Sequence, residues 1–452
     1  MIPNIGKLAV LKSKFDYNQK KKDKWTSKRF EAMEYYSGNT NEFTSKYFSK
    51  TTLNKIVVGN VNVTKRVIDR ISLVYMTPPI RTYSIEDIPD IFTNKDLKLQ
   101  RLERVTNLLD GVLIKPCWRV DDQGNGSIEY DIIWDYEPIF DDNDPLTPVG
   151  FTYPIAKKSS VLDDNPEMYA YWDKDNHFTF DNSGKMYTEE DNPDMINPYG
   201  RLPFVECFRE GKPEFNYMDT NPSMDLISTN LAINVAETNK NANVMFQSFG
   251  YLFINGTGID TQDQMDIGQD KINYLGVDGS ISIVSPPNAI PALDESIKSS
   301  YKLLSQNYHL PTSFVEGTTA ESGVALRLRN QELSDDRRSD VTRWREIEYK
   351  LFDLESTIIA VELGRDAGEL EDVDFSESVD ILSDQEQRDK WDWELSKGLI
   401  DKADILMQRN PDLSREEAED YLFERQGVEL ETEEEEEETN PLLRALQSPA
   451  GE

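Results

Sequence analysis

The first 80 residues carry the spacing of apolar and polar side chains that is typical of amphipathic helices. A lysine-rich stretch around Trp25 predicts one helix, which ends at Gly38, a residue type common just after helices. Apolar side chains then recur at intervals of three, four and seven over residues 61–75, which predicts a second helix. The proline pair that begins at Pro78 ends this second helix, because proline lacks the amide hydrogen that helices need.

Between residues 112 and 210 the pattern changes to short apolar runs of strand length. Two runs, 112–120 and 127–134, flank Gly124-Asn125-Gly126, which predicts a β-hairpin. Further runs, each bounded by Asp, Asn, Gly or Pro, follow at 150–153, 168–172, 177–180 and 203–208. Because no helical pattern separates successive runs, we expect an antiparallel meander rather than alternating strands and helices.

A long helix is predicted over residues 221–249, where Asn221 precedes Pro222 in the arrangement favoured at a helix start. This helix has no broad apolar stripe and is rich in asparagine, at Asn230, Asn234, Asn239, Asn241 and Asn243. We therefore expect it to pack against copies of itself or to line water rather than to fill a core.

A compact β insertion is predicted next, over residues 250–287. Its three runs of strand-forming residues are 251–254, 271–277 and 281–284, with a tight turn at Asp278-Gly279 between the last two. A further helix begins at Pro291 and ends before Pro311, with large apolar or aromatic residues at every third or fourth position.

The longest predicted helix covers residues 322–363, roughly 60 Å, because no proline or other strong breaker interrupts it. Six of the ten residues 334–343 are charged, and we expect this stretch to be exposed or to face a neighbouring chain. The second half has an apolar stripe made of Trp344, Ile347, Leu351, Leu354, Ile358 and Val361. Small helices follow over 377–426, where we expect Trp391 and Trp393 to pack within the block rather than to bind a ligand.

The chain is strongly acidic. Among its 452 residues, 84 Asp and Glu outnumber 49 Lys and Arg, which gives a formal net charge of −35. Eight glutamates lie within residues 429–438 and predict a solvated, disordered tail, but without them the net charge is still −27. A protein of this charge is poorly suited to gripping phosphates, so we expect any contact with DNA to be loose.

Several classes of protein are disfavoured by what the sequence lacks. Two cysteines and two histidines leave little material for a disulfide framework, a Cys/His metal site or a histidine-based catalytic triad. No apolar run approaches the length of a membrane helix, the first residues lack a signal-peptide core, and no phosphate-binding Walker loop is present. We expect a reducing, cytoplasmic setting, with no cofactor and no bound metal.

Two local features have competing interpretations. The acidic clusters at 121–122, 141–144 and 173–175 offer ligands for a divalent ion, but aspartate is also favoured in turns, which is the interpretation we prefer. The basic residues around Trp25 either contact a partner or DNA, or form a solvated helix face, and we prefer the solvated face; they are Lys20 to Lys22, Lys24, Lys28 and Arg29.

Five short motifs follow one another along the chain. They are Trp25-x3-Arg29-x4-Glu34-Tyr35-Tyr36-x-Gly38; the helix of 62–75 before Pro78-Pro79; Asn197-Pro198-Tyr199-Gly200-Arg201-Leu202-Pro203-Phe204-Val205; Ser322-Gly323-Val324-Ala325-Leu326-Arg327; and Asp384-Gln385-Glu386-Gln387-Arg388 with Gly398-Leu399-Ile400 and Asp412-x2-Arg415-Glu416-Glu417-Ala418-Glu419. Together with the series helix, β insertion, helix, short loop and long helix, this order resembles the portal proteins of tailed bacteriophages, of the siphophage type, over residues 20–427.

The resemblance implies an α+β portal fold, with a mainly α-helical stem, wing spine and crown, an antiparallel β wing sheet and a small α/β clip. Its parts would be the wing (1–220), stem helix 1 (221–249), clip (250–290), stem helix 2 (291–310), tunnel loop (311–321), wing spine (322–376), crown (377–428) and acidic tail (429–452).

The same resemblance implies a role without catalysis. Portal subunits form a ring, of twelve in virions, at one capsid vertex, and double-stranded DNA passes through its axis during packaging and ejection. The implied partners are further copies of the chain, the DNA, terminase, a head-completion adaptor, and the major capsid and scaffolding proteins, with no membrane. The implied location is the virion, and the host cytoplasm during assembly.

The resemblance also implies two sets of functional residues. The tunnel-loop residues near DNA would be Phe314, Val315, Glu316, Gly317, Thr318 and Thr319. Since this loop holds a glutamate and no lysine, Lys298 and Lys302 on the preceding helix are better candidates to reduce the negative charge of the tunnel lining. The clip residues that dock terminase and adaptor would include Gly256, Lys271, Asn273, Tyr274, Asp278 and Gly279.

Two alternatives stay open. Another ring-forming connector or tail protein of a virion would lack the helix–clip–helix insertion. A metal-dependent hydrolase would need carboxylates from separate elements near one ion, and its activity would be lost in Asp141→Ala.

Overall fold

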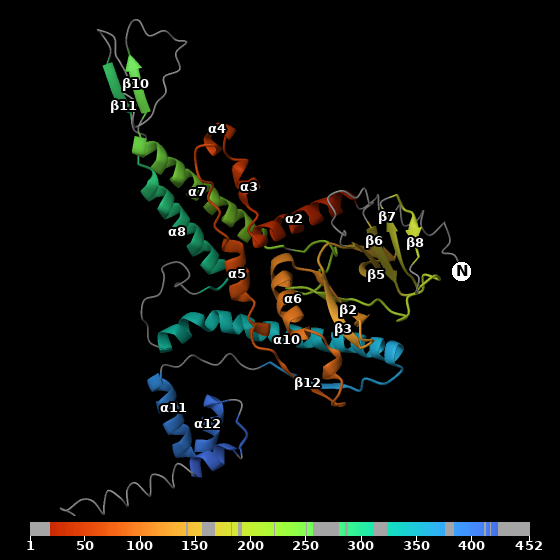
Figure 1. Ribbon diagram of the computed structural model, residues 1–452. Helices are drawn as coiled ribbons and strands as arrows, with labels where there is room; N and C mark the ends of the chain where they lie inside the picture. Colours follow the sequence, from red (N-terminus) through yellow and green to blue (C-terminus); the bar gives the residue numbers. More distant parts are fainter. Residues whose placement is uncertain are drawn as a thin grey trace, which may run out of the picture. The chain divides into compact units, whose positions relative to one another are not determined.

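The fold combines helices with antiparallel sheets (Figure 1). The computed structural model describes residues 19–141, 143–155, 168–181, 183–188, 192–220, 222–249, 251–255, 280–284, 288–310, 323–375, 384–410, 413–415 and 417–423. These residues fall into two compact units, one drawn from Met1–Thr319 and Asn330–Ser378, the other from Ala320–Arg329 and Val379–Glu452.

Short helices open the first unit. They are α2 (Gln19–Ser37), α3 (Asn41–Ser45), α4 (Lys50–Leu53), α5 (Val63–Ile71) and the 3-10 turn η1 (Val74–Met76). The helix predicted over 61–75 is therefore shorter than expected. It ends because the buried carboxylate of Glu103 accepts the backbone N–H groups of Val74 and Tyr75, at 2.8 and 3.0 Å, in place of helical carbonyls.

The prediction of a solvated basic face on α2 is wrong for Arg29, which is 1% exposed. Its guanidinium donates to the carbonyl oxygens of Leu109, Gly111 and Trp134, at 2.6 to 3.1 Å. The first two of these acceptors lie at the C-terminal end of α6 (Lys95–Leu109), where helix carbonyls lack partners and a cation is favourable. Arg29 thus caps α6 rather than facing solvent.

The antiparallel sheets predicted from the strand pattern are confirmed. A three-stranded sheet has the order β3-β2-β9, and the hairpin of β2 (Val112–Val120) and β3 (Gly126–Ile133) turns where Gly124-Asn125-Gly126 predicts it. The third strand of this sheet is β9 (Val205–Cys207). A five-stranded meander follows the hairpin in the chain: β4 (Glu137–Asp141), β5 (Asp144–Pro154), β6 (Met168–Asp173), β7 (His177–Asp181) and β8 (Met186–Tyr187). The strand β1 (Ile80–Tyr83), which the 3-10 turn η2 (Pro89–Ile91) follows, pairs with β12 (Leu370–Asp374).

A helical hairpin follows the sheets. The predicted helices are observed as α7 (Met224–Phe249) and α8 (Ile290–Asn307), which run side by side with β10 (Tyr251–Asn255) and β11 (Ser280–Val284) at the end of the hairpin (Figure 1). Strands β10 and β11 pair antiparallel, with Tyr251 opposite Val284. The third predicted strand of this insertion, 271–277, lies outside the described residues.

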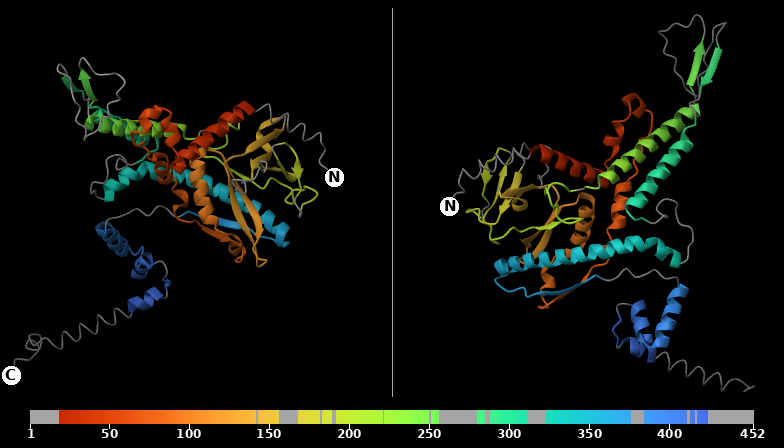
Figure 2. Two further views of the ribbon diagram at one scale, coloured as in Figure 1. Left: turned by 45° about the horizontal axis from the view of Figure 1, so that its top comes forward. Right: turned by 180° about the vertical axis from the view of Figure 1, so that it is seen from behind.

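The predicted 60 Å helix is α10 (Gly323–Leu363), which passes beneath α5, α6, β2 and β3 in Figures 1 and 2. Its apolar stripe is buried from Trp344 to Ile358 and packs on the main core of the unit. Val361, the last residue of the predicted stripe, is instead 46% exposed, because it lies beyond the packed part of the helix.

The second unit contains α11 (Asp384–Lys397) and α12 (Lys402–Arg409). The side chain of Trp391 donates to Gln408 at 3.1 Å and stacks with Arg409, so it packs within this unit as expected. The same expectation is wrong for Trp393, which is 56% exposed, because it lies two residues further along the helix and so points to another face.

Candidate functional site

The loop and clip residues singled out from the sequence lie outside the described residues. They are Phe314, Val315, Glu316, Gly317, Thr318 and Thr319 in the predicted tunnel loop, and Gly256, Lys271, Asn273, Tyr274, Asp278 and Gly279 in the predicted clip. The structure describes the elements that lead into both segments, namely α7, α8, α10 and the strands β10 and β11. These supporting elements are the candidate functional site.

Helix α7 is held by asparagine side chains that face the body of the unit. Asn230 and Asn234 are fully buried. The carboxamide oxygen of Asn230 accepts the backbone N–H of Thr64 at 2.9 Å, and that of Asn234 accepts the N–H of Val61 at 2.8 Å. The expectation that the asparagine-rich face contacts other copies or water is therefore wrong for these residues, which bind the backbone just before and at the start of α5.

The close approach of this backbone to α7 depends on a glycine. A Cβ at Gly59 would lie 2.8 Å from the Cβ of Glu237 and 2.9 Å from the carbonyl oxygen of Asn234. The N–H of Gly59 donates to the buried hydroxyl of Thr238 at 2.9 Å. Hydrogen bonds between side chains of α7 and backbone groups of residues 59–64 thus fix α7 along several turns.

Helix α8 presents its two candidate lysines to solvent. Ile297 and Leu304 lie on the buried seam against α7, as the sequence predicts. Lys298 and Lys302 lie on the exposed side of the same helix. Lysines four residues apart lie on the same face. An ion pair between Lys240 and Asp294, 3.1 Å apart, ties α8 to α7.

Tyr308 and His309, which directly follow α8, contact α7 and α10. The hydroxyl of Tyr308 donates to Asp225 at the start of α7, at 2.8 Å. His309 Nδ1 lies 2.6 Å from the carboxylate of Asp336 on α10, and Arg337 donates to the carbonyl of Leu73 at 3.2 Å. The segment directly after α8 is therefore attached both to α7 and to Asp336 of α10, within the first unit.

Helix α10 is anchored by a buried ionic cluster that the sequence analysis did not identify. Glu348 and Glu355, two turns apart on α10, have side chains with no exposed area. Arg81 of β1 lies 2.7 Å from Glu348, and Lys95 of α6 lies 2.8 Å from Glu355. The cluster could have been found from the sequence, because the two glutamates are seven residues apart and lie within the apolar stripe, where core residues are expected.

Two tyrosines complete this cluster. Tyr75 donates to Glu348 at 2.9 Å, and Tyr130 of β3 donates to Glu355 at 2.6 Å. Burial raises the pKa of both phenols, and the nearby carboxylates raise it further. Burial also acts to raise the pKa of Glu348, but Lys95 and Arg81 outweigh it, so the pKa of that carboxyl is lowered. Both buried glutamates thus have a cation and a tyrosine as partners, and the cluster supports α10 structurally.

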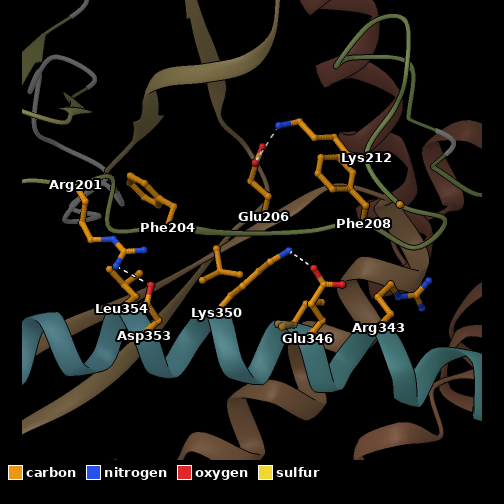
Figure 3. A pocket seen from close by; sticks show the side chains of 13 residues that line it. Arg201, Phe204, Glu206, Phe208, Lys212, Arg343, Glu346, Lys350, Asp353 and Leu354 are labelled. Carbon is orange, nitrogen blue, oxygen red and sulfur yellow. Dashed lines mark hydrogen bonds and ion pairs between the residues drawn. The ribbon is translucent and has the colours of Figure 1, made fainter. Parts of the chain in front are cut away.

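A pocket of about 580 Å³ lies between the 201–212 segment and α10 (Figure 3). Its charged side chains neutralise one another: Arg201 lies 2.7 Å from Asp353, Lys212 lies 3.3 Å from Glu206, and Lys350 lies 2.6 Å from Glu346. Because each of these cations already has a carboxylate partner, we do not expect them to bind an anion in the pocket.

The acidic clusters form turns, as preferred from the sequence. Asp121 accepts the backbone N–H groups of Gln123 and Asn125, both at 2.8 Å, and Asp173 accepts those of Asp175 and Asn176 at 2.7 and 2.6 Å. Within the part of the chain that the structure describes, no three His, Cys, Asp or Glu side chains are grouped as ligands for one ion.

Comparison with known proteins adds no relative. No protein-family model matches the chain, and no curated protein matches it. Among the described residues, every helix is too short or too polar to cross a lipid bilayer.

Proposed function

We propose that the chain is a subunit of the portal ring of a tailed bacteriophage, through which double-stranded DNA is packaged and ejected. The observation that carries the proposal is the order α7, β10–β11, α8, α10, in which a helical hairpin with a β tip is followed by one helix of 41 residues. In the portal family this order corresponds to stem, clip, stem and wing spine, and α2 to β9 would then form the wing.

The charge of the chain supports a passage rather than a binding site for DNA. Twelve copies of a chain with a net charge of −35 would carry −420 formal charges. An acidic lining disfavours lasting contact with phosphates, because binding of a polyanion depends on its neutralisation by cations. In this arrangement the exposed Lys298 and Lys302 of α8 would reduce the repulsion where DNA passes closest.

The proposed role needs no catalytic residue and no cofactor in this chain. Terminase would hydrolyse ATP and dock on the clip segment between β10 and β11, which the adaptor would occupy after packaging. The capsid and scaffolding proteins would surround the wing, so the protein would belong to the capsid vertex of the virion.

Negative-stain electron microscopy of the purified full chain tests this proposal. We expect rings with an open centre, a narrow end formed by the α7–α8 hairpins and a broad outer rim. A chain that stays monomeric over a range of protein and salt concentrations would contradict the proposal. A ring without the narrow hairpin end would favour another virion connector.

A further inference from the structure

Two exposed surfaces of opposite charge lie on the first unit, and neither is used by the sites described above. One is a basic face on α5 and α6, and the other is an acidic edge around β12. The residues of the basic face are Lys65, Arg66, Arg70, Arg101 and Arg104. The residues of the acidic edge are Asp87, Glu362, Asp366, Glu369, Glu371 and Asp372.

The basic face draws its residues from two neighbouring helices. On α5, Arg66 and Arg70 are one turn apart, and on α6, Arg101 and Arg104 are three residues apart, so each pair shares a helix face. The helices are linked by Asp69, which lies 3.5 Å from Arg104 and accepts the hydroxyl of Tyr36 at 2.8 Å. Lys65 lies 5.8 Å from the ring of the same tyrosine.

The acidic edge is formed by segments that β1 and β12 bring together. Ser84 and Glu369 exchange two hydrogen bonds, at 2.8 and 2.9 Å, which places the turn after β1 beside the turn before β12. Within residues 84–90 and 362–372 the one cation is Arg365, and it already pairs with Asp87 at 2.6 Å. The other carboxylates named above therefore give this edge a strong negative charge.

The α5 part of the basic face lies far from the acidic edge within one copy. Arg337 of α10 contacts Leu73, which follows α5, whereas Glu362 at the acidic edge lies 25 residues further along the same helix. At 1.5 Å per residue this separation is about 38 Å. Both surfaces belong to the same compact unit, and over such a distance their charges are screened from each other in physiological salt.

We propose that the basic face of one copy of this chain docks on the acidic edge of the next copy. The proposal rests on the ring proposed above. A closed ring requires two different surfaces per subunit, each meeting its counterpart on a neighbour. Copies with a net charge of −35 repel one another, so a matched pair of opposite surfaces would both lower the repulsion and fix the direction of assembly.

Charge reversal tests this docking. We prepare R70E/R101E, E369K/E371K and the variant that combines all four changes, and we measure the ring population by mass photometry. We expect each double variant to lower the ring population by about tenfold and the combined variant to restore it, because opposite charges then meet again. A matched control, K55E/K174E, changes two exposed lysines outside both surfaces and should leave the rings intact.

Three results would overturn the docking. R70E/R101E could form rings as the wild type does. The combined variant could fail to recover while its circular dichroism and thermal unfolding match those of the wild type. R70E/R101E could keep its rings and lose binding of a 60-base-pair duplex probe, which would make the basic face a DNA surface. If the wild type itself forms no ring, the proposed function fails; if only the variants behave unexpectedly, the docking alone fails.

Discussion

The ammonium group of Lys95 lies 2.8 Å from the carboxylate of Glu355, and the two side chains are 5% and 0% exposed. This pair joins the first residue of α6 to the middle of α10, across 260 positions of sequence. Tyr130 donates to the same carboxylate, so both of its oxygens have partners. Removing one member of such a pair leaves a buried charge without compensation.

Glu355→Ala is therefore expected to lower the free energy of unfolding by about 3–5 kcal/mol. The control is Glu129→Ala, which removes an ion pair with Arg119 in which both side chains are about half exposed, and which should cost less than about 1 kcal/mol. Urea unfolding at a fixed protein concentration measures both values. Equal effects of the two substitutions would show that the buried cluster does not anchor α10.

The pH dependence of stability is expected to contain a contribution from Glu103. Burial raises the pKa of this carboxyl to about 7, although the N–H groups of Tyr75 and Val74 act to lower it. Since the folded state binds the proton more tightly than the unfolded chain, this group stabilises the fold fully below the pKa of the unfolded state, about 4.3. That contribution is lost as the pH rises towards about 7.

Glu103→Gln removes this titration. The stability of the wild type relative to this variant should fall between pH 4.5 and 7 and then stay level. Urea unfolding at several pH values measures the difference, with Glu210→Gln, at a side chain that is 67% exposed, as the control. A difference that does not change over this pH range would contradict the raised pKa.

The buried asparagines of α7 are expected to matter more than the exposed ones. Asn234→Ala leaves the N–H of Val61 without its acceptor, which should cost about 1–3 kcal/mol. Asn239→Ala on the same helix changes an exposed residue and should be nearly neutral. Hydrogen exchange at the amides of 59–64 provides a local measurement. Unchanged exchange in Asn234→Ala would mean that the side chain does not hold this segment.

Lys298 and Lys302 provide a test of the proposed passage. K298A/K302A should leave ring formation intact, because both side chains are exposed on α8, and should lower the amount of DNA packaged severalfold by making the lining more negative. Protection of DNA from nuclease, in a packaging reaction with terminase and proheads, measures this effect. K55A/K174A is the matched control. Equal packaging by the two variants would exclude the lysines from the passage.

The sequence predicts well what depends on local signals. The glycine-containing turn at 124–126, the proline at 291 and the unbroken stretch of 322–363 each act through neighbouring residues, and the corresponding hairpin and helices are observed. Helix α6 was missed although it lies in the core, because polar residues such as Glu103 and Asn107 interrupt its buried face.

Polar residues with distant partners account for the other errors. Arg29, Asn234 and Glu355 have side chains that are typical of surfaces, and each is buried because its partners lie at least 80 positions away in the sequence. The periodicity of apolar and polar residues along the chain reveals only local structure, so it does not identify partners this far apart in the sequence. The residues singled out in the clip and tunnel loop stay predictions, since they lie outside the described residues.

Helix α10 is tied to its surroundings at several levels: by Asp336 and Arg337, by Glu348 and Glu355, and by Asp353. A helix that is held by contacts at so many points resists bending, because a force on one part of it is distributed over all of these contacts. A load applied near Asp336 would therefore be shared with the contacts of Glu348, Asp353 and Glu355 before it could bend the helix.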